Sequence, residues 1–376
     1  MTKEEYRTGA ENVIYLAGCM VNGEEPDAEQ VRQMDLSVLY KLSEFHLLTG
    51  IVGYALEAAG VDDHAFRQAN RKAIRKAALL DTERAAVLEE MEKAGIWYMP
   101  LKGCALKEMY PQVGMRQMSD NDILFDAGRA DDVKAIMEQM DYSVEYFGKG
   151  NHDVYHKKPV CNFEMHRALF GEGHEDRLQE YYRNVKDRLV KDEGNRYGFH
   201  FTLEDFYIYM TAHEYKHYSG GGTGLRSLLD TYVYLRNVPM DMSYVEAEVR
   251  KLGIDGFEKA NRSLALGLFG GGERSEEDRE MLEYILSSGT YGTVTHRIEN
   301  DMQKHGWGKF RYMLHRFSVP VSRKNKDYDA FASAYPLFYK HKILLPALLI
   351  YRPARAMWEG RFRAEAKAIR NVKGRK

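Results

Sequence analysis

The segment Ser119-Asp120-Asn121-Asp122-Ile123-Leu124-Phe125 has the pattern of a short β-strand that carries two carboxylates two residues apart. Side chains alternate along a strand, so Asp120 and Asp122 are expected to share one face. Two neighbouring carboxylates repel each other unless a cation lies between them, and hard oxygen ligands on a rigid face suit Mg²⁺. The pair therefore indicates metal-assisted phosphoryl or nucleotidyl transfer.

A phosphate-binding turn is predicted upstream of this pair. The segment Gly95-Ile96-Trp97-Tyr98-Met99-Pro100-Leu101 has the pattern of a buried strand, and Lys102-Gly103 and a helical run from Cys104 to Tyr110 follow it. The free N–H groups and the dipole of a helix start both favour an anion. Lys102 adds a compact positive charge at the same place.

The segment Val160-Cys161-Asn162-Phe163-Glu164-Met165-His166 offers the third acid that a two-metal site requires. Alternation places Glu164 and His166 on one face of a strand and the apolar residues on the other. A solvent-facing glutamate on a half-buried sheet has the same pattern. The pattern alone therefore leaves a structural role for Glu164 open.

In these segments the chain resembles the uncharacterised nucleotidyltransferase family of the polymerase-β-type superfamily. The likeness covers most of residues 90 to 352. It rests on segments that occur in the family's order and rough spacing: Leu101-Lys102-Gly103, Tyr110-Pro111, Gly114-Met115-Arg116, Ser119 to Leu124, Phe163-Glu164-Met165-His166, the helix with His213 and His217, Leu225 to Asp230, Tyr335-Pro336 and Leu344-Leu345-Pro346.

The resemblance implies an α+β fold, with a small mixed sheet between helical N-terminal and C-terminal regions. It implies that Asp120, Asp122 and Glu164 are catalytic and bind Mg²⁺ or Mn²⁺. An acceptor hydroxyl would attack the α-phosphate of an NTP, expected to be ATP, and AMP would be transferred. The acceptor could be a small molecule, a sugar or a protein. The candidate nucleotide-binding residues are Lys102, Gly103, Arg116, Ser119, His166, His213, His217, Arg226 and Asp230.

Two positions differ from the superfamily's usual pattern. Cys104 follows Gly103 where serine or glycine is usual, and a thiol is a poor substitute for a hydroxyl toward phosphate. Asn121 replaces an apolar residue between the two acids, which predicts that this side of the strand is less buried. A catalytically degenerate binding module with the same fold is therefore an alternative.

A second alternative is a zinc hydrolase, because His213-Glu214-Tyr215-Lys216-His217 fits the H-E-x-x-H pattern. On a helix both histidines would share a face, with Glu214 as general base. A third ligand is not evident, and Gly220-Gly221-Gly222 is expected to end the helix. We therefore expect this helix to close over the nucleotide site instead, although hydrogen-bonded core histidines fit the same pattern.

Arg226 and Asp230 have two interpretations. Their spacing of four residues permits a simple ion pair on a helix, which contributes a few tenths of a kcal/mol. In the functional interpretation Arg226 neutralises phosphate, while Asp230 orients a histidine or the acceptor.

Composition limits the partners and the compartment that are expected for this protein. The 376 residues carry a formal net charge of −2, which gives no general attraction to nucleic acid, and no specific nucleic-acid partner is predicted. Three cysteines favour a reducing compartment over a disulfide framework. No signal sequence is visible, and the longest apolar run, residues 343–351, is too short to span a bilayer. A cytoplasmic protein is expected.

Three regions are predicted along the chain: a helical region over 1–92, a nucleotidyltransferase-like core over 93–198 and a helical domain over 199–376. In the core, a helix is expected over 130–140 and a hairpin turn at Lys157-Lys158-Pro159. The tail from Arg352 to Lys376 carries nine lysines and arginines with Met357, Trp358 and Phe362 among them. Such a tail suits peripheral contact with a membrane or an anionic polymer, although a solvated helix end has the same composition. The sequence leaves the oligomeric state open.

Overall fold

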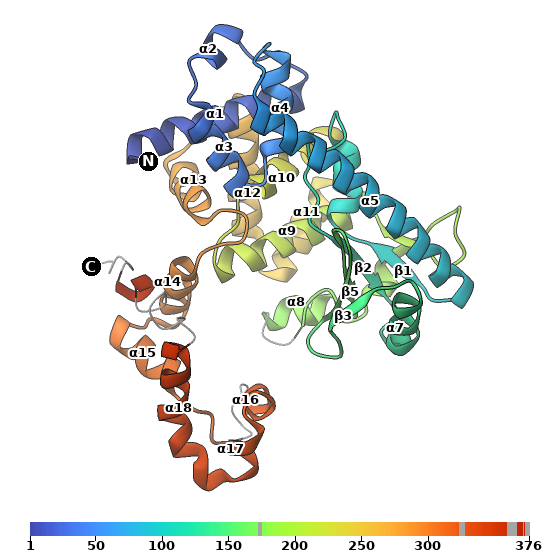
Figure 1. Ribbon diagram of the computed structural model, residues 1–376, viewed down its shortest axis with the longest axis vertical. Helices are drawn as coiled ribbons and strands as arrows, with labels where there is room; N and C mark the ends of the chain where they lie inside the picture. The colour runs from blue at the N-terminus through green and yellow to red at the C-terminus, as the bar shows by residue number, and fades with distance from the viewer. Residues whose placement is uncertain (172–174, 323–327, 359–366, 371, 373–376) are drawn as a thin grey trace. The chain divides into compact units, whose positions relative to one another are not determined.

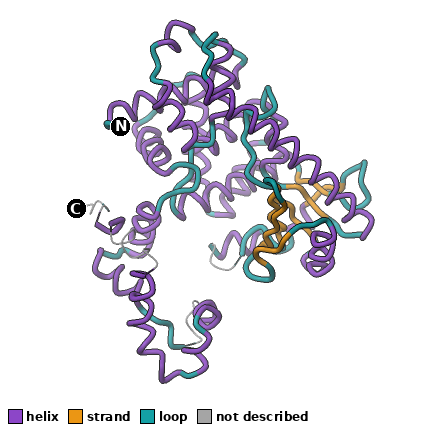
Figure 2. Tube along the Cα trace, in the orientation of Figure 1, coloured by secondary structure: helices purple, strands orange, loops and turns teal. Residues whose placement is uncertain are grey.

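A five-stranded mixed sheet carries the acidic segments. The strand order is β1-β2-β5-β4-β3, in which β2 and β5 run parallel and the other neighbours are antiparallel. The strands are β1 Tyr98–Pro100, β2 Asn121–Phe125, β3 Ser143–Tyr146, β4 His152–Lys157 and β5 Cys161–His166. Helices make up most of the remaining chain, and the strands gather in one region (Figure 2). The α+β prediction is confirmed.

The computed structural model describes residues 1–171, 175–322, 328–358, 367–370 and 372. The chain forms two units, of which the first comprises Met1–Lys216 with Thr223–Thr290 and the second His217–Gly222 with Tyr291–Lys376. Most of the tail beyond Trp358, including Phe362, lies outside the described residues.

Helices precede, interrupt and follow the sheet in the first unit. Before and within the sheet they are α1 Lys3–Asn22, α2 Ala28–Arg32, α3 Leu36–Phe45, α4 Thr49–Ala58, α5 His64–Ala94, α6 Gly103–Leu106, η1 Lys107–Met109, η2 Ala127–Arg129 and α7 Ala130–Gln139. After it come α8 Asp176–Tyr181, η3 Val185–Arg188, the hairpin of β6 Leu189–Lys191 and β7 Phe199–Phe201, α9 Leu203–Gly220, α10 Leu225–Asn237, α11 Met242–Leu252, α12 Asp255–Phe269 and α13 Glu276–Ser288.

The two faces of the sheet have different neighbours. Alternate residues such as Ile123 and Phe125 pack against α5 and α7 in one apolar core (Figure 1). Leu124, between them, belongs to a second core formed with α8 to α11. Because Asp122 and Leu124 are two residues apart, the acids lie on this second face, toward the later helices.

Local sequence accounts for the element boundaries around the site. Asp63 caps α5 by accepting from the N–H groups of Ala65 and Phe66, and Gly95 ends the helix with φ of +67°. This glycine cap delays the predicted strand, so β1 begins only at Tyr98. The predicted hairpin is confirmed, since β4 and β5 pair antiparallel across the expected turn. The helix predicted over 130–140 is confirmed as α7.

The second unit contains helices α14 Val294–His305, α15 Lys309–Phe317, α16 Tyr328–Ala334, α17 Pro336–Lys340, η4 Lys342–Leu344 and α18 Leu345–Trp358. Tyr328, Tyr339, Leu345 and Leu348 form a small core in it. Within the described ranges, no helix combines the length and apolarity needed to cross a membrane. The three cysteines are buried and none forms a disulfide, as predicted.

Candidate active site

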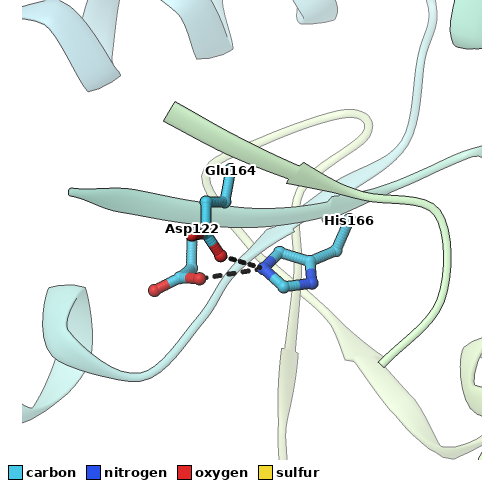
Figure 3. Close-up of side chains that lie close together, drawn as sticks. All are labelled: Asp122, Glu164 and His166. Carbon is cyan, nitrogen blue, oxygen red and sulfur yellow. Dashed lines mark hydrogen bonds and ion pairs between the residues drawn. The ribbon is translucent and has the colours of Figure 1, made fainter. Parts of the chain in front are cut away.

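The parallel pairing of β2 and β5 brings the acids together. Asp122 and Glu164 are direct partners in this pairing, and Asp120 immediately precedes β2. The carboxylates of Asp122 and Glu164 and the ring of His166 point toward one another (Figure 3). Their ligand atoms lie within 4.8 Å, the one such group of three found among the residues described here. Two strands from distant parts of the sequence thus build one acidic centre.

Asp122 is held by two positively polarised groups. Lys102 Nζ and His166 Nε2 both lie 2.8 Å from Asp122 Oδ1, and His166 Nε2 lies 3.6 Å from Glu164 Oε2. The other ring nitrogen of His166, Nδ1, is buried and has no hydrogen-bond partner among the residues that the structure describes. We therefore assign the imidazole proton to Nε2, where it is donated to Asp122. In this tautomer His166 orients the carboxylate, and the oxygens of the acids remain the ligands for a cation.

The acids differ in their protonation. Although burial opposes it, Lys102 and His166 lower the pKa of Asp122 well below its usual range. The neighbouring His166 also lowers the pKa of Glu164. Burial and the charges of Asp122 and Glu164 raise the pKa of Asp120. Negative charge is therefore crowded here beyond what the charge of Lys102 and the hydrogen bond from His166 offset, which is the condition a bound cation relieves.

Lys102 occupies an unusual backbone position. It is the N-cap of α6, with φ of +48° and ψ of −110°, a region that side-chain-bearing residues rarely adopt. Strain of this kind persists where the surrounding structure fixes it, often at functional sites. The turn carries the Lys102 side chain to Asp122, so the predicted phosphate-binding turn and the acids form one site.

Different local contacts surround Gly103 and Cys104. A Cβ on Gly103 would lie 2.6 Å from Arg116 Nη1 and 2.8 Å from Met118 Cε, so a larger residue would force the ends of these side chains to shift. The thiol of Cys104 is buried and donates to Asn121 Oδ1 at 3.7 Å. Burial raises the pKa of this thiol. Cys104 therefore packs against Asn121 of β2 as a buried, uncharged thiol.

The expectation that Asn121 marks a less buried side of the strand is wrong. Asn121 is completely buried between the sheet and α5. Its amide nitrogen donates to the Leu80 carbonyl at 2.9 Å, and its oxygen accepts from Arg84 at 3.1 Å. These bonds satisfy the amide, so a polar residue is tolerated where an apolar one is usual.

Arg116 and Asp230 form a buried ion pair. Arg116 Nε and Nη2 donate to the two oxygens of Asp230 at 2.7 and 2.8 Å, and the Tyr110 hydroxyl donates to the same carboxylate at 2.7 Å. Asp230 lies on α10, so the pair joins the core to the helical region. Neither the phosphate contact predicted for Arg116 nor the acceptor contact predicted for Asp230 is tested by this geometry.

The other predicted nucleotide-binding residues surround the centre less closely. Arg226 donates from Nη1 to the Gln117 carbonyl at 3.1 Å, and its charge partly opposes the burial and like charges that raise the pKa of Asp120. Ser119 is half-buried beside Asp120. His213 is half-buried and His217 exposed, so their roles stay predictions.

Lys216 is a residue near the site that sequence analysis missed. Tyr209, His213 and Lys216 recur at helical spacing on α9, and the rings of Tyr209 and His213 are 6.1 Å apart. Burial and the charge of Lys102 lower the pKa of Lys216 to about 8, against the attraction of Asp122 and Glu164. Lys216 lies inside the H-E-x-x-H match, three residues after His213, and this helical spacing is the sequence feature that could have identified it.

Glu214, the proposed base of a zinc hydrolase, forms buried hydrogen bonds to two neighbouring helices. It is buried, and its Oε2 accepts from Asn261 at 2.9 Å and from Thr231 at 3.2 Å. Burial raises the pKa of Glu214 to about 7. Asn261 and Thr231 lie on α12 and α10, so Glu214 joins three helices. This placement removes the residue that would activate water in the hydrolase alternative.

Glu214→Gln should make the protein more stable above neutral pH. The pKa of Glu214 is higher in the folded state than in the unfolded state. The folded protein therefore loses stability as the pH rises from the ordinary pKa of a glutamate toward 7, because the carboxyl ionises first in the unfolded state. The shift corresponds to about 3 kcal/mol at pH 8. Urea unfolding of both proteins at pH 4.5 and pH 8 measures the difference, which should vanish at the lower pH. The exposed Glu283→Gln is the control, and equal pH profiles for wild type and Glu214→Gln would contradict the prediction.

Neighbouring carboxylates beside a lysine at a helix start are typical of metal-assisted phosphoryl-transfer proteins. The chain belongs to a family described as uncharacterised nucleotidyltransferases, whose model matches residues 32–270. The matched region contains the whole five-stranded sheet and helices α9 and α10. No curated protein and no solved structure matches the chain.

Proposed function

We propose that this protein is a Mg²⁺-dependent nucleotidyltransferase that moves AMP from ATP to an acceptor hydroxyl. The acceptor oxygen would attack the α-phosphorus, the bond from that phosphorus to the bridging oxygen would break, and pyrophosphate would leave. The observation that carries the proposal is the pairing of Asp122 with Glu164 on adjacent parallel strands, beside Lys102. Membership of the nucleotidyltransferase family supports the same reaction.

The residues present fit a divalent cation. Asp120, Asp122 and Glu164 would hold it. Burial and the charges of Asp122 and Glu164 raise the pKa of Asp120, which supports a site whose negative charge a cation would balance. When bound, Mg²⁺ would polarise the phosphate and lower the pKa of the acceptor hydroxyl. His166 keeps the Asp122 carboxylate oriented through its Nε2 proton. All-oxygen ligands favour Mg²⁺, and Mn²⁺ is the natural substitute.

Three basic side chains are available for the triphosphate. Lys102 forms an ion pair with Asp122, and it would exchange that contact for a phosphate oxygen when the nucleotide binds. Lys216 and Arg226 each have an electrostatic influence on the acids from the helical region. We assign Arg116 to positioning, because Asp230 accepts from two of its nitrogens.

The test is Glu164→Gln. The rate at which labelled AMP is transferred from α-labelled ATP to an acceptor should fall by at least about two orders of magnitude. The reason is that the Glu164 carboxylate is needed in the transition state. Binding of ATP with Mg²⁺, measured as a rise in melting temperature, should persist. The same thermal-shift measurement with the other three NTPs tests the choice of ATP.

Glu145→Gln is the matched control, since Glu145 is an exposed glutamate on β3 of the same sheet and should be dispensable. A wild-type protein that binds ATP but turns over none of it with any acceptor class would favour the binding-module alternative. Stoichiometric, tightly bound zinc in the purified protein would support the hydrolase alternative. Transfer that is unaffected in Glu164→Gln would show that the third acid lies elsewhere.

A further inference from the structure

Helix α18 in the second unit is apolar on two opposite sides. Leu345 and Leu348 face the small core of this unit. On the other side of α18, Ile350 and Met357 are seven residues apart and are 76% and 55% exposed. A spacing of seven is about two helical turns, so these two residues share one side of the helix. Ile343, in the short turn η4 that leads into α18, is 89% exposed. We call Ile343, Ile350, Met357 and the 93% exposed Trp358 the outer face of α18.

The outer face lacks the polar residues that a solvated helix carries. Only Arg352 and Arg355 among the 14 residues of α18 are charged. Arg352 is used inside the unit, where it donates to the carbonyls of Ser318 at 2.7 Å and Arg316 at 3.2 Å at the end of α15. A helix that is apolar on both sides is normally covered on both. The outer face therefore needs an occupant.

The charge of the sequence that contains this face indicates the kind of occupant. Residues 302–358 contain 11 lysines and arginines and two aspartates, a net charge of +9, in a chain whose total is −2. Lys340 and Lys342 directly precede the outer face. A second copy of the same face would bring two strongly positive surfaces together, which is unfavourable. The charge fits an anionic surface.

We propose that the outer face of α18 binds the surface of an anionic lipid bilayer. Aliphatic side chains and a terminal tryptophan suit the boundary between headgroups and acyl chains, while lysines and arginines attract the headgroups. A nucleic acid would fit the charge but would leave Ile343 and Ile350 without apolar contact. Phe310 and Leu314 on α15, which packs beside α18, are further exposed apolar residues of this unit.

Full-length protein should bind vesicles made of phosphatidylcholine and phosphatidylglycerol in equal parts, and should bind pure phosphatidylcholine much less. Ile350→Ser and Ile343→Ser should each lower the partition coefficient by about tenfold. Added salt should weaken binding of the wild type. Val113→Ser, which alters an exposed apolar residue of the first unit, is the matched control and should bind normally.

Tryptophan fluorescence gives a second readout on the same vesicles. Trp358 is highly exposed, whereas Trp307 is stacked against His305 and Trp97 is packed in the core. The emission of the wild type should shift to shorter wavelength on binding, and this shift should be lost in Trp358→Phe. Three results would overturn the proposal: no binding to the anionic vesicles, unchanged binding by Ile350→Ser, or a solution dimer that Ile350→Ser dissociates.

Discussion

Asp122→Asn should lower nucleotidyl transfer by at least about three orders of magnitude, because it removes a carboxylate from the centre that would hold the cation. The metal-free protein should also lose stability, by about 3 kcal/mol, since Lys102 and His166 would be left buried without their charged acceptor. The lowered pKa of Asp122 sets the direction of the pH dependence. The carboxylate stabilises the folded protein fully above the ordinary pKa range of an aspartate, and this stabilisation is lost as the pH falls through the folded-state pKa.

Asp120→Asn is the informative comparison. It should remove transfer equally well, yet raise the stability of the metal-free protein at pH 8 by up to about 4 kcal/mol. The reason is that burial and two like charges raise the pKa of Asp120, so its ionised form costs stability. Sequence alone predicts unchanged or raised stability for both variants, and the structure restricts that prediction to Asp120. Full transfer activity in either variant, or the opposite order of stabilities, would refute this assignment.

Asp230→Ala should destabilise the protein by about 3–5 kcal/mol, measured by urea unfolding, because Arg116 would remain buried without a partner. Tyr110 would lose its acceptor as well. Replacing all three polar side chains, as Arg116→Met, Asp230→Leu and Tyr110→Phe together, should recover most of the loss, since apolar groups of similar size need no partners.

The exposed pair Arg279 and Glu276 is the control for this experiment, and Arg279→Ala should cost about 0.5 kcal/mol or less. If Asp230→Ala were as mild as Arg279→Ala, the pair would not be what holds α10 to the core. If instead the triple variant were stable but inactive, Arg116 would be needed for nucleotide binding as the family resemblance predicts.

The sequence predicted the acidic centre better than its surroundings. Alternation along each strand was enough to predict that Asp120 and Asp122 share a face and that Glu164 and His166 share a face, because the strand period is a local property. Their meeting required a family resemblance, since no local pattern tells that β2 and β5 pair in parallel. The partners of Asp230 were missed for the same reason: the sequence offered Arg226 four residues away, whereas the structure supplies Arg116 from a distant loop.

Asn121 has a consequence for the accuracy of folding. If β2 slipped by one residue against its neighbours, every side chain on it would change sides. Asp122 would then enter the apolar core between the sheet, α5 and α7, and a carboxylate there without a partner costs several kcal/mol. The Asn121 amide would also leave the Leu80 carbonyl and Arg84. One buried amide between two acids therefore selects a single alignment of the strand and penalises the mispaired isomer.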